Sequence, residues 1–157
     1  MQVRRARIND KNRIVELLNQ VLMVHHNGRP DLFKENCRKY TDEELDVLMK
    51  EESHPIFVAV DDRDQVLGYA FCIIKQALHD NILTDIKTLY IDDLCVDEKI
   101  RGQHIGKALY DAAVEFAKKQ NCYNLTLNVW SCNEEALHFY EKCGLNPQKI
   151  GMEKILL

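Results

Sequence analysis

The chain has 157 residues, of which 46% are hydrophobic and 29% are charged, and its formal net charge at pH 7 is −4. This length and apolar content suffice for one folded domain, so we expect residues 1–157 to form a single domain with its own core. A net negative charge gives no general attraction to nucleic acid or to an anionic membrane, and neither is expected as a partner.

The six cysteines are scattered and include no C-x-x-C pair, which argues against a zinc site and against a disulfide framework. No stretch approaches the roughly 18 apolar residues of a membrane span, and residues 1–8 lack the apolar segment of a secretory signal. We therefore expect a reduced, cytoplasmic protein that binds no metal.

Two helices are predicted in the first third of the chain. The first should begin after Asn9 and Asp10 and end near residues 28–30, because apolar residues recur between them at helical spacing. These residues are Ile14, Leu17, Leu18, Val21 and Leu22. Thr41 followed by Glu44 is a capping-box pattern, which predicts a second, shorter helix. Its apolar side consists of Leu45, Leu48 and Met49.

The middle of the chain has the composition of β-strands. Residues 56–60 and 66–74 are runs of β-branched and aromatic residues, and the aspartate-rich stretch 61–64 between them predicts a hairpin. Residues 76–85 are predicted to form a loop, and residues 88–96 the next strand.

Helices and strands alternate in the second half of the chain. Helical spacing returns over residues 105–117, and a buried-type strand is predicted over residues 125–129. A helix over residues 133–143 should end at Gly144, and residues 149–157 should form a last strand. With a strand at the N-terminus, the order is β-α-α-β-β-β-α-β-α-β. This order predicts an α/β fold with a mixed, mostly antiparallel, twisted sheet flanked by helices.

The segment between the strand 88–96 and the following helix has features of an anion-binding loop. It contains Gly102 and Gly106 together with several cations, and a helix N-terminus presents unpaired N–H groups to an anion. The spacing matches neither a P-loop nor a G-x-G-x-x-G dinucleotide loop. On spacing alone, the two glycines could serve only the turn and the packing of the helix.

Two motifs in this half resemble those of the GCN5-related N-acetyltransferase (GNAT) superfamily. The loop resembles the signature R/Q-x-x-G-x-G/A, either from Arg101, with His104 in place of the first glycine, or from Gln103 through Gly106 to Ala108. Residues 133–145 resemble the second motif, N-x-x-A-x-x-F/Y-Y-x-x-x-G-F/L. The resemblance covers essentially the whole chain and is best over residues 89–145.

The resemblance implies that acetyl-CoA binds as the acetyl donor. The backbone of Leu94, Cys95 and Val96 would hydrogen-bond the pantetheine arm, and the thioester would lie where the strands 89–96 and 125–129 splay apart. Asn133, which is also the expected N-cap of its helix, and Phe139 would contact the coenzyme. The backbone N–H groups implied to hold the pyrophosphate are those of Gln103, His104, Ile105, Gly106 and Lys107. Arg101 and Gly102 are implied to contact the coenzyme as well.

Tyr140 is the predicted general acid, because a phenol at the thioester sulfur can donate a proton as thiolate charge develops. The alternative is that Tyr140 only packs at the edge of the coenzyme. Asp92 is the predicted base, acting through water, because residues 92–96 resemble a segment of the spermidine/spermine acetyltransferases. Asp93, a histidine or water alone could also take this role. Because strand side chains alternate, we expect Asp92 and Asp93 to point to opposite faces.

The resemblance also implies that residues 25–31 and 76–85 select the acceptor. We expect transfer of the acetyl group to a primary amine of a small molecule, such as a polyamine or an amino-acid-like compound. A peptide amine is the other acceptor considered. One alternative is a protein N-terminal acetyltransferase of the ribosomal-protein type, which residues 152–154 resemble weakly. Another is a non-catalytic sensor that binds acetyl-CoA. Superfamily members often dimerise, so a homodimer is also implied, although no feature of this sequence shows it.

Overall fold

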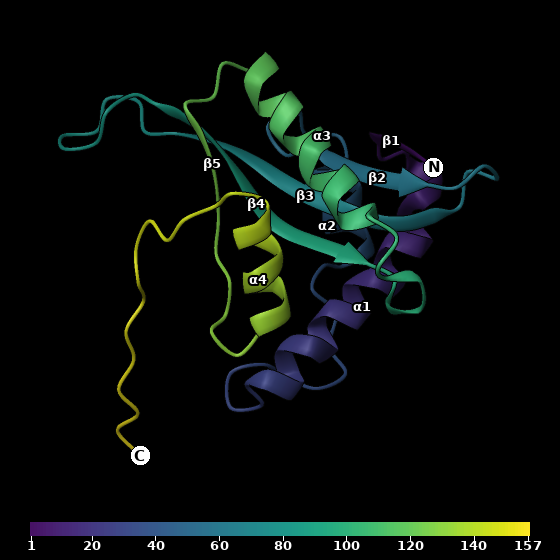
Figure 1. Ribbon diagram of the computed structural model, residues 1–157, viewed down its shortest axis with the longest axis horizontal. Helices are drawn as coiled ribbons and strands as arrows, with labels where there is room; N and C mark the ends of the chain where they lie inside the picture. Colours follow the sequence, from purple (N-terminus) through teal and green to yellow (C-terminus); the bar gives the residue numbers. More distant parts are fainter.

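The computed structural model describes residues 1–157 and contains one five-stranded sheet flanked by four α-helices (Figure 1). The predicted fold class is confirmed. The strands are β1 (Gln2–Arg5), β2 (Ile56–Val60), β3 (Val66–Gln76), β4 (Lys87–Val96) and β5 (Asn124–Leu127). The helices are α1 (Lys11–Gly28), α2 (Asp42–Leu48), α3 (Ile105–Lys119) and α4 (Glu134–Lys142). No helix combines the length and the apolar character that crossing a bilayer would need.

The strands lie in the sheet in the order in which they occur in the chain, from β1 to β5. The first four are joined antiparallel, whereas β4 and β5 are parallel. Parallel neighbours need a crossover connection, and α3 supplies it between these two strands. The sheet is therefore mixed and mostly antiparallel, as the sequence predicts.

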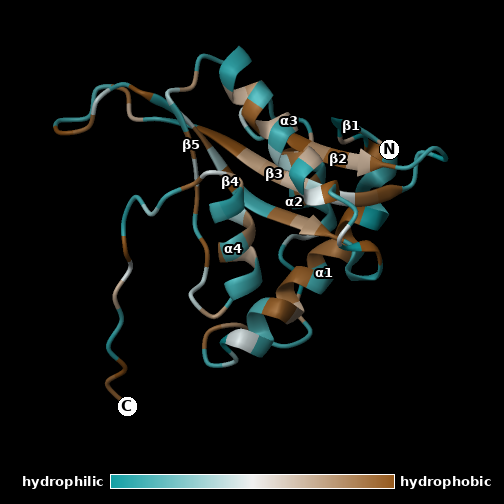
Figure 2. Ribbon diagram, viewed as in Figure 1, coloured by the Kyte–Doolittle hydropathy of each residue, from teal (hydrophilic) through white to brown (hydrophobic).

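Helices cover both faces of the sheet, and each face has its own apolar core. On one face, α1 and α2 pack Ile14 and Leu45 against Val58 of β2. On the other, α3 packs Leu109 against Ala59, the next residue of β2. Every residue of β2 is buried, which explains why this strand is apolar throughout instead of alternating. Figure 2 shows the resulting hydrophobic strands between helices of mixed character.

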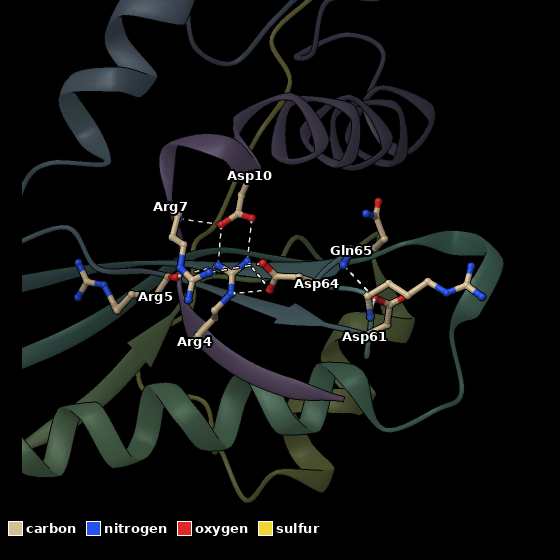
Figure 3. Close-up of polar contacts among 8 residues, drawn as sticks. Arg4, Arg5, Arg7, Asp10, Asp61, Asp64 and Gln65 are labelled. Carbon is tan, nitrogen blue, oxygen red and sulfur yellow. Dashed lines mark hydrogen bonds and ion pairs between the residues drawn. The ribbon is translucent and has the colours of Figure 1, made fainter.

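A charged cluster fixes the first strand to the start of α1 and to the hairpin between β2 and β3 (Figure 3). The Arg4 guanidinium donates to both carboxylate oxygens of Asp10, at 2.7 and 3.0 Å, and to Asp64 at 2.9 Å. Asp10 also accepts the backbone N–H of Arg7. Because Arg4 and Asp10 are largely buried, neither charge is left without a partner inside the protein.

The capping box before α2 is confirmed. The Thr41 hydroxyl accepts the N–H of Glu44 at 3.1 Å, and the Glu44 carboxylate accepts the N–H of Thr41 at 2.8 Å. The helix begins at Asp42, one residue after this cap. The local sequence signal therefore decides where α2 starts.

The predicted last strand is wrong. Residues 146–157 form no strand and make no backbone hydrogen bond; they run as an extended tail (Figure 1), whose Glu153 lies 2.9 Å from Arg29 at the end of α1. A strand forms only where its backbone pairs with a neighbouring strand, and no backbone hydrogen bond joins the tail to any strand of this chain.

Candidate functional site

The strands β4 and β5 separate in the middle of the sheet. They pair from Thr88 opposite Asn124 to Ile91 opposite Leu127, and no further. Because β4 continues to Val96, its last five residues have no strand neighbour on the β5 side. Figure 1 shows the two strands diverging. The splay that the sequence resemblance implies is confirmed.

A β-bulge lies at the point where this separation begins. In the pairing with β3, Phe71 is opposite Asp93 and Cys72 is opposite Ile91, so Asp92 is an extra residue with no partner. On opposite sides of the bulge, Ile91 packs on the α3 face of the sheet, whereas Cys95 packs on the α1 face. Regular alternation would put both residues on one face, so the bulge reverses the pleat.

As a consequence, Asp92 and Asp93 do not point to opposite faces, and the prediction that they would is wrong. Both carboxylates bind the same cation, the ammonium of Lys39, at 3.0 Å from Asp92 and 3.4 Å from Asp93. The bulge thus turns two adjacent residues into a carboxylate pair. Lys39 comes from the connection between α1 and α2, where no motif in the sequence marks it.

Two phenols complete this acidic pocket. The Tyr69 hydroxyl donates to Asp93 at 3.1 Å, and the Tyr40 hydroxyl donates to Asp92 at 3.4 Å. The Asp93 side chain is only 8% exposed, and burial raises its pKa above the ordinary value, although Lys39 and Tyr69 act against this shift. Burial alone would lower the pKa of Lys39, but the charges of Asp93 and Asp92 outweigh it and raise that pKa. The pocket is therefore suited to a primary ammonium group.

Tyr140 lies on α4, next to Phe139, with the two ring centroids 5.0 Å apart. Both rings pack against the core on the α3 face. Burial raises the pKa of Tyr140 above its ordinary value, and the charge of Asp93 acts in the same direction. The phenol therefore keeps its proton at neutral pH, and Asp93 lies within electrostatic range of it.

The loop before α3 has the left-handed backbone that a tight turn into a helix requires. Gly102 has φ 82°, and His104, the N-cap of α3, has φ 60° and ψ 13°. His104 makes no side-chain capping hydrogen bond, so the N–H groups of residues 105–107 have no acceptor within the chain. His104 therefore stands where the family signature has a glycine, and the backbone at this position does have a positive φ.

The start of α3 lies against the end of β4 and against α4. A Cβ atom on Gly106 would lie 3.5 Å from the Phe139 ring and 3.6 Å from Val96. Val96 and Leu94 pack on the α3 face, and the Cys95 thiol donates to a backbone carbonyl of α1. The end of β4, the start of α3 and α4 therefore meet at one place, where the backbone of residues 94–96 is the part left to bind a ligand.

Most of the other side chains around this loop are already engaged within the chain, either in ion pairs or in the core. Arg101 lies 3.7 Å from Glu135, Lys107 forms an ion pair with Asp111, and the side chain of Ile105 is buried in the core. Gln103 is exposed. The free donors here are thus backbone N–H groups, and these, with the positive end of the α3 dipole, fit a diphosphate.

Asn133 is the N-cap of α4, as predicted, and its side-chain oxygen accepts the N–H of Ala136 at 3.2 Å. The side chain lies at the end of the loop that follows β5. The helix thus begins where the second motif of the sequence begins.

The predicted acceptor segment at the end of α1 is folded against its neighbours. His26 bonds the backbone carbonyl of Phe33 at 2.8 Å, and the Phe33 ring packs against His25 and against Trp130 from the loop after β5. Arg29 is paired with Asp31. No sequence motif marks Phe33 or Trp130, because only the folded chain brings these two segments together.

The loop after β5 also approaches α1 through Cys132, the one exposed cysteine of the six. A Cβ atom on Gly28, the last residue of α1, would lie only 2.7 Å from the Cys132 sulfur. Glycine at this position therefore permits the close contact between the loop and the helix.

Known proteins match this arrangement over nearly the whole chain. The model of the acetyltransferase (GNAT) family matches residues 21–145. The glucosamine 6-phosphate N-acetyltransferase of Arabidopsis thaliana is 27% identical over 156 residues, which are 98% of this chain and 95% of the relative. The peptidyl-lysine N-acetyltransferase YjaB of Salmonella typhimurium is 28% identical over 144 residues, 92% of this chain and 82% of the relative.

A solved structure is also similar. The crystal structure of a mutant of the BH1408 protein from Bacillus halodurans is 30% identical, covers 100% of both chains and has a TM-score of 0.95.

Proposed function

Because the chain belongs to the acetyltransferase (GNAT) family and is an acetyl-transferring enzyme, we propose that it moves an acetyl group from acetyl-CoA to a primary amine of a small molecule. Residues 1–157 would act as one domain. The observation that carries the proposal is the acidic pocket of Asp92 and Asp93, which holds a primary ammonium where β4 leaves β5.

Acetyl-CoA would supply the acetyl group as a thioester. The N–H groups of residues 103–107 would hold its diphosphate, and the unpaired edge of residues 94–96 would bind the pantetheine arm. Phe139 and Asn133 would line the same site. Support comes from the uncapped start of α3 and from the contact between Gly106 and Phe139.

Tyr140 would act as the general acid. Its raised pKa keeps the proton on the phenol oxygen, from which it would pass to the sulfur as negative charge develops there. No hydrogen bond within the chain engages this hydroxyl, so it is free to face a ligand.

Asp92 would accept the proton of the acceptor ammonium, through a water molecule. It is the more accessible of the two carboxylates, with 28% of its side chain exposed against 8% for Asp93. Asp93 would hold the second negative charge that attracts the ammonium. Before attack the amine must lose a proton, and a carboxylate beside it provides a place for that proton.

The amine of a lysine side chain in a peptide is the second candidate acceptor. Lys39 shows that the pocket admits a lysine side chain, and the Salmonella relative is named for acting on peptidyl-lysine. An N-terminal amine of a protein would need the same pocket. These acceptors are distinguished by a panel of polyamines, amino sugars, lysine peptides and N-terminal peptides, with release of free thiol as the readout.

The proposal is tested by comparing Tyr140→Phe with a control variant, Tyr123→Phe, whose ring is 76% exposed. We expect Tyr140→Phe to lose about 100-fold or more in kcat, the usual contribution of a general acid, and to bind acetyl-CoA with unchanged affinity in calorimetry. The control variant Tyr123→Phe should keep both the kcat and the acetyl-CoA affinity of the unaltered protein. Absence of acetyl-CoA binding by the folded protein would refute the proposal, and full turnover by Tyr140→Phe would refute the role of the phenol.

A further inference from the structure

Lys39 is the one lysine of the chain whose ammonium contacts the carboxylates of two residues. Its Nζ lies 3.0 Å from Asp92 and 3.4 Å from Asp93. The other lysines that form ion pairs lie on α1 or α3 and have one acidic partner each. Lys39 is therefore the only lysine that occupies the pocket to which we assign the acceptor amine.

The neighbours of Lys39 hold it in this place. The ring of Tyr40 stacks on Phe71 of β3, with the ring centroids 5.9 Å apart and the planes 14° from parallel. The next residue, Thr41, caps α2. The Lys39 side chain is 35% exposed, so it is anchored by the protein and is still accessible to a ligand.

Lys39 and Tyr140 approach the separation of β4 and β5 from opposite faces of the sheet. Tyr69, which donates to Asp93, belongs to the core on the α1 face, and Lys39 binds the same carboxylate. Tyr140 packs on the α3 face. Burial raises the pKa of Tyr140 and the charge of Asp93 adds to the rise, so this carboxylate is near both groups. A thioester bound between the strands would have an amine on one side and a phenol on the other, as acetyl transfer requires.

We propose that Lys39 is itself an acetylation site, and that each chain transfers one acetyl group from acetyl-CoA to its own Lys39. The inference rests on the proposed function, because it uses the same donor, the same phenol and the same carboxylates. It adds an acceptor that belongs to the enzyme itself.

The step is an aminolysis of the thioester and needs no oxidant or reductant. Asp92 would take one proton from the Lys39 ammonium through water, and Nζ would then attack the carbonyl carbon. The C–N bond forms as the C–S bond breaks. Tyr140 would protonate the leaving thiolate, and the second proton lost by the nitrogen would return to the phenol through water. The products are acetylated Lys39, one free thiol and one proton released to the solvent.

Acetylation would change the pocket, because an acetylated lysine carries no charge. Asp92 and Asp93 would lose their internal cation and become available to the ammonium of a free acceptor. The protein with acetylated Lys39 should therefore have a several-fold lower KM for a cationic acceptor than Lys39→Arg, whose guanidinium stays charged. An equal KM would contradict this effect of the acetylation.

Incubation of the unaltered protein with acetyl-CoA and no acceptor tests the proposal. The intact mass should rise by one acetyl group per chain, peptide mapping should place this group on Lys39, and the rate constant should not depend on protein concentration. Lys34 lies in the same connection, is exposed and has no ion pair, so it reports purely chemical acetylation. Modification of Lys34 as fast as Lys39, or a rate constant that rises with protein concentration, would overturn the proposal.

Three variants complete the test. Lys39→Arg keeps the positive charge but offers no amine, so it should take up no acetyl group in the same time, whereas Lys34→Arg should be acetylated like the unaltered protein. Tyr140→Phe should acetylate Lys39 about 100-fold more slowly. Turnover of free amines without any acetyl group on Lys39 would refute this inference and leave the proposed function intact. Binding of acetyl-CoA without transfer to Lys39 or to any free amine would refute both.

Discussion

His104 adopts the left-handed conformation at the N-cap of α3, and its side chain forms no capping hydrogen bond there. A residue with a Cβ atom is strained in this region, and glycine is not. We expect His104→Gly to raise the free energy of unfolding by about 1 kcal/mol. Urea denaturation measures this change.

The control for this prediction is His138→Gly. His138 is exposed and lies inside α4, where glycine should lower the free energy of unfolding by about 1 kcal/mol. The two substitutions are chemically identical, so opposite signs would show that the backbone conformation decides the outcome. A loss of stability in both variants would mean that His104 makes a stabilising contribution that its geometry does not reveal.

Lys39 occupies the place that we assign to the acceptor amine. Lys39→Met removes the competing ammonium and leaves a side chain of similar length, so the KM for a cationic acceptor should fall several-fold while the affinity for acetyl-CoA stays unchanged. Lys34→Met, in the same connection but exposed and without an ion pair, is the control and should leave KM unaltered. A rise of KM in the Lys39 variant would show that Lys39 helps to bind the acceptor instead of competing with it.

At the level of helices and strands, the capping box of α2 fixes the segment that carries Lys39 and Tyr40. Thr41→Ala should lower the free energy of unfolding by about 1 kcal/mol, because the N–H of Glu44 loses its acceptor. Thermal or urea denaturation measures the loss. Thr84→Ala in the exposed loop after β3 is the control and should change stability by less than half of that amount. Equal effects of the two substitutions would contradict the role of the cap.

Local signals were sufficient to predict most elements of the fold. The cap at Thr41 and the spacing of apolar residues in α1 and α3 depend on the neighbouring sequence alone, and β2 was predicted at its observed ends. The family motifs located Gly106, Asn133 and Tyr140 at one place, and the structure brings their segments together.

Features that depend on pairing could not be predicted in this way. The bulge at Asp92 exists only relative to the register of β3, so alternation gave the wrong directions for the two aspartates. The position of Lys39 depends on the path of a connection without regular structure. The tail has the pattern of a strand, but whether a strand forms depends on an edge that the sequence does not reveal.

At the level of the whole molecule, the cluster of Arg4, Asp10 and Asp64 links the first strand, α1 and the hairpin. Burial alone would raise the pKa of Asp10, but the hydrogen bonds from Arg4 and Arg7 outweigh burial and hold this pKa below its ordinary value. The stabilisation by the Asp10 carboxylate is therefore complete above the unfolded-state pKa of about 3.9, and it is lost as the pH falls through the lower folded-state pKa.

We expect the urea midpoint to be level near neutral pH and to fall steeply below about pH 4. Asp10→Asn should flatten this fall and lower the free energy of unfolding at pH 7 by about 3 kcal/mol, because Arg4 loses a buried partner. Asp85→Asn, in the exposed loop, should leave the profile as it is. An unchanged acid profile in Asp10→Asn would show that other carboxylates govern acid unfolding.

The contact between Gly28 and Cys132 places an exposed thiol between the end of α1 and the loop after β5. Cys72 and Cys95 are buried, and burial raises the pKa of each thiol to about 12, so neither should react with a maleimide dye in the folded protein. Cys132 is the one exposed thiol, and its sulfur lies against the end of α1, so a dye attached to it would report on the contact between α1 and the loop after β5.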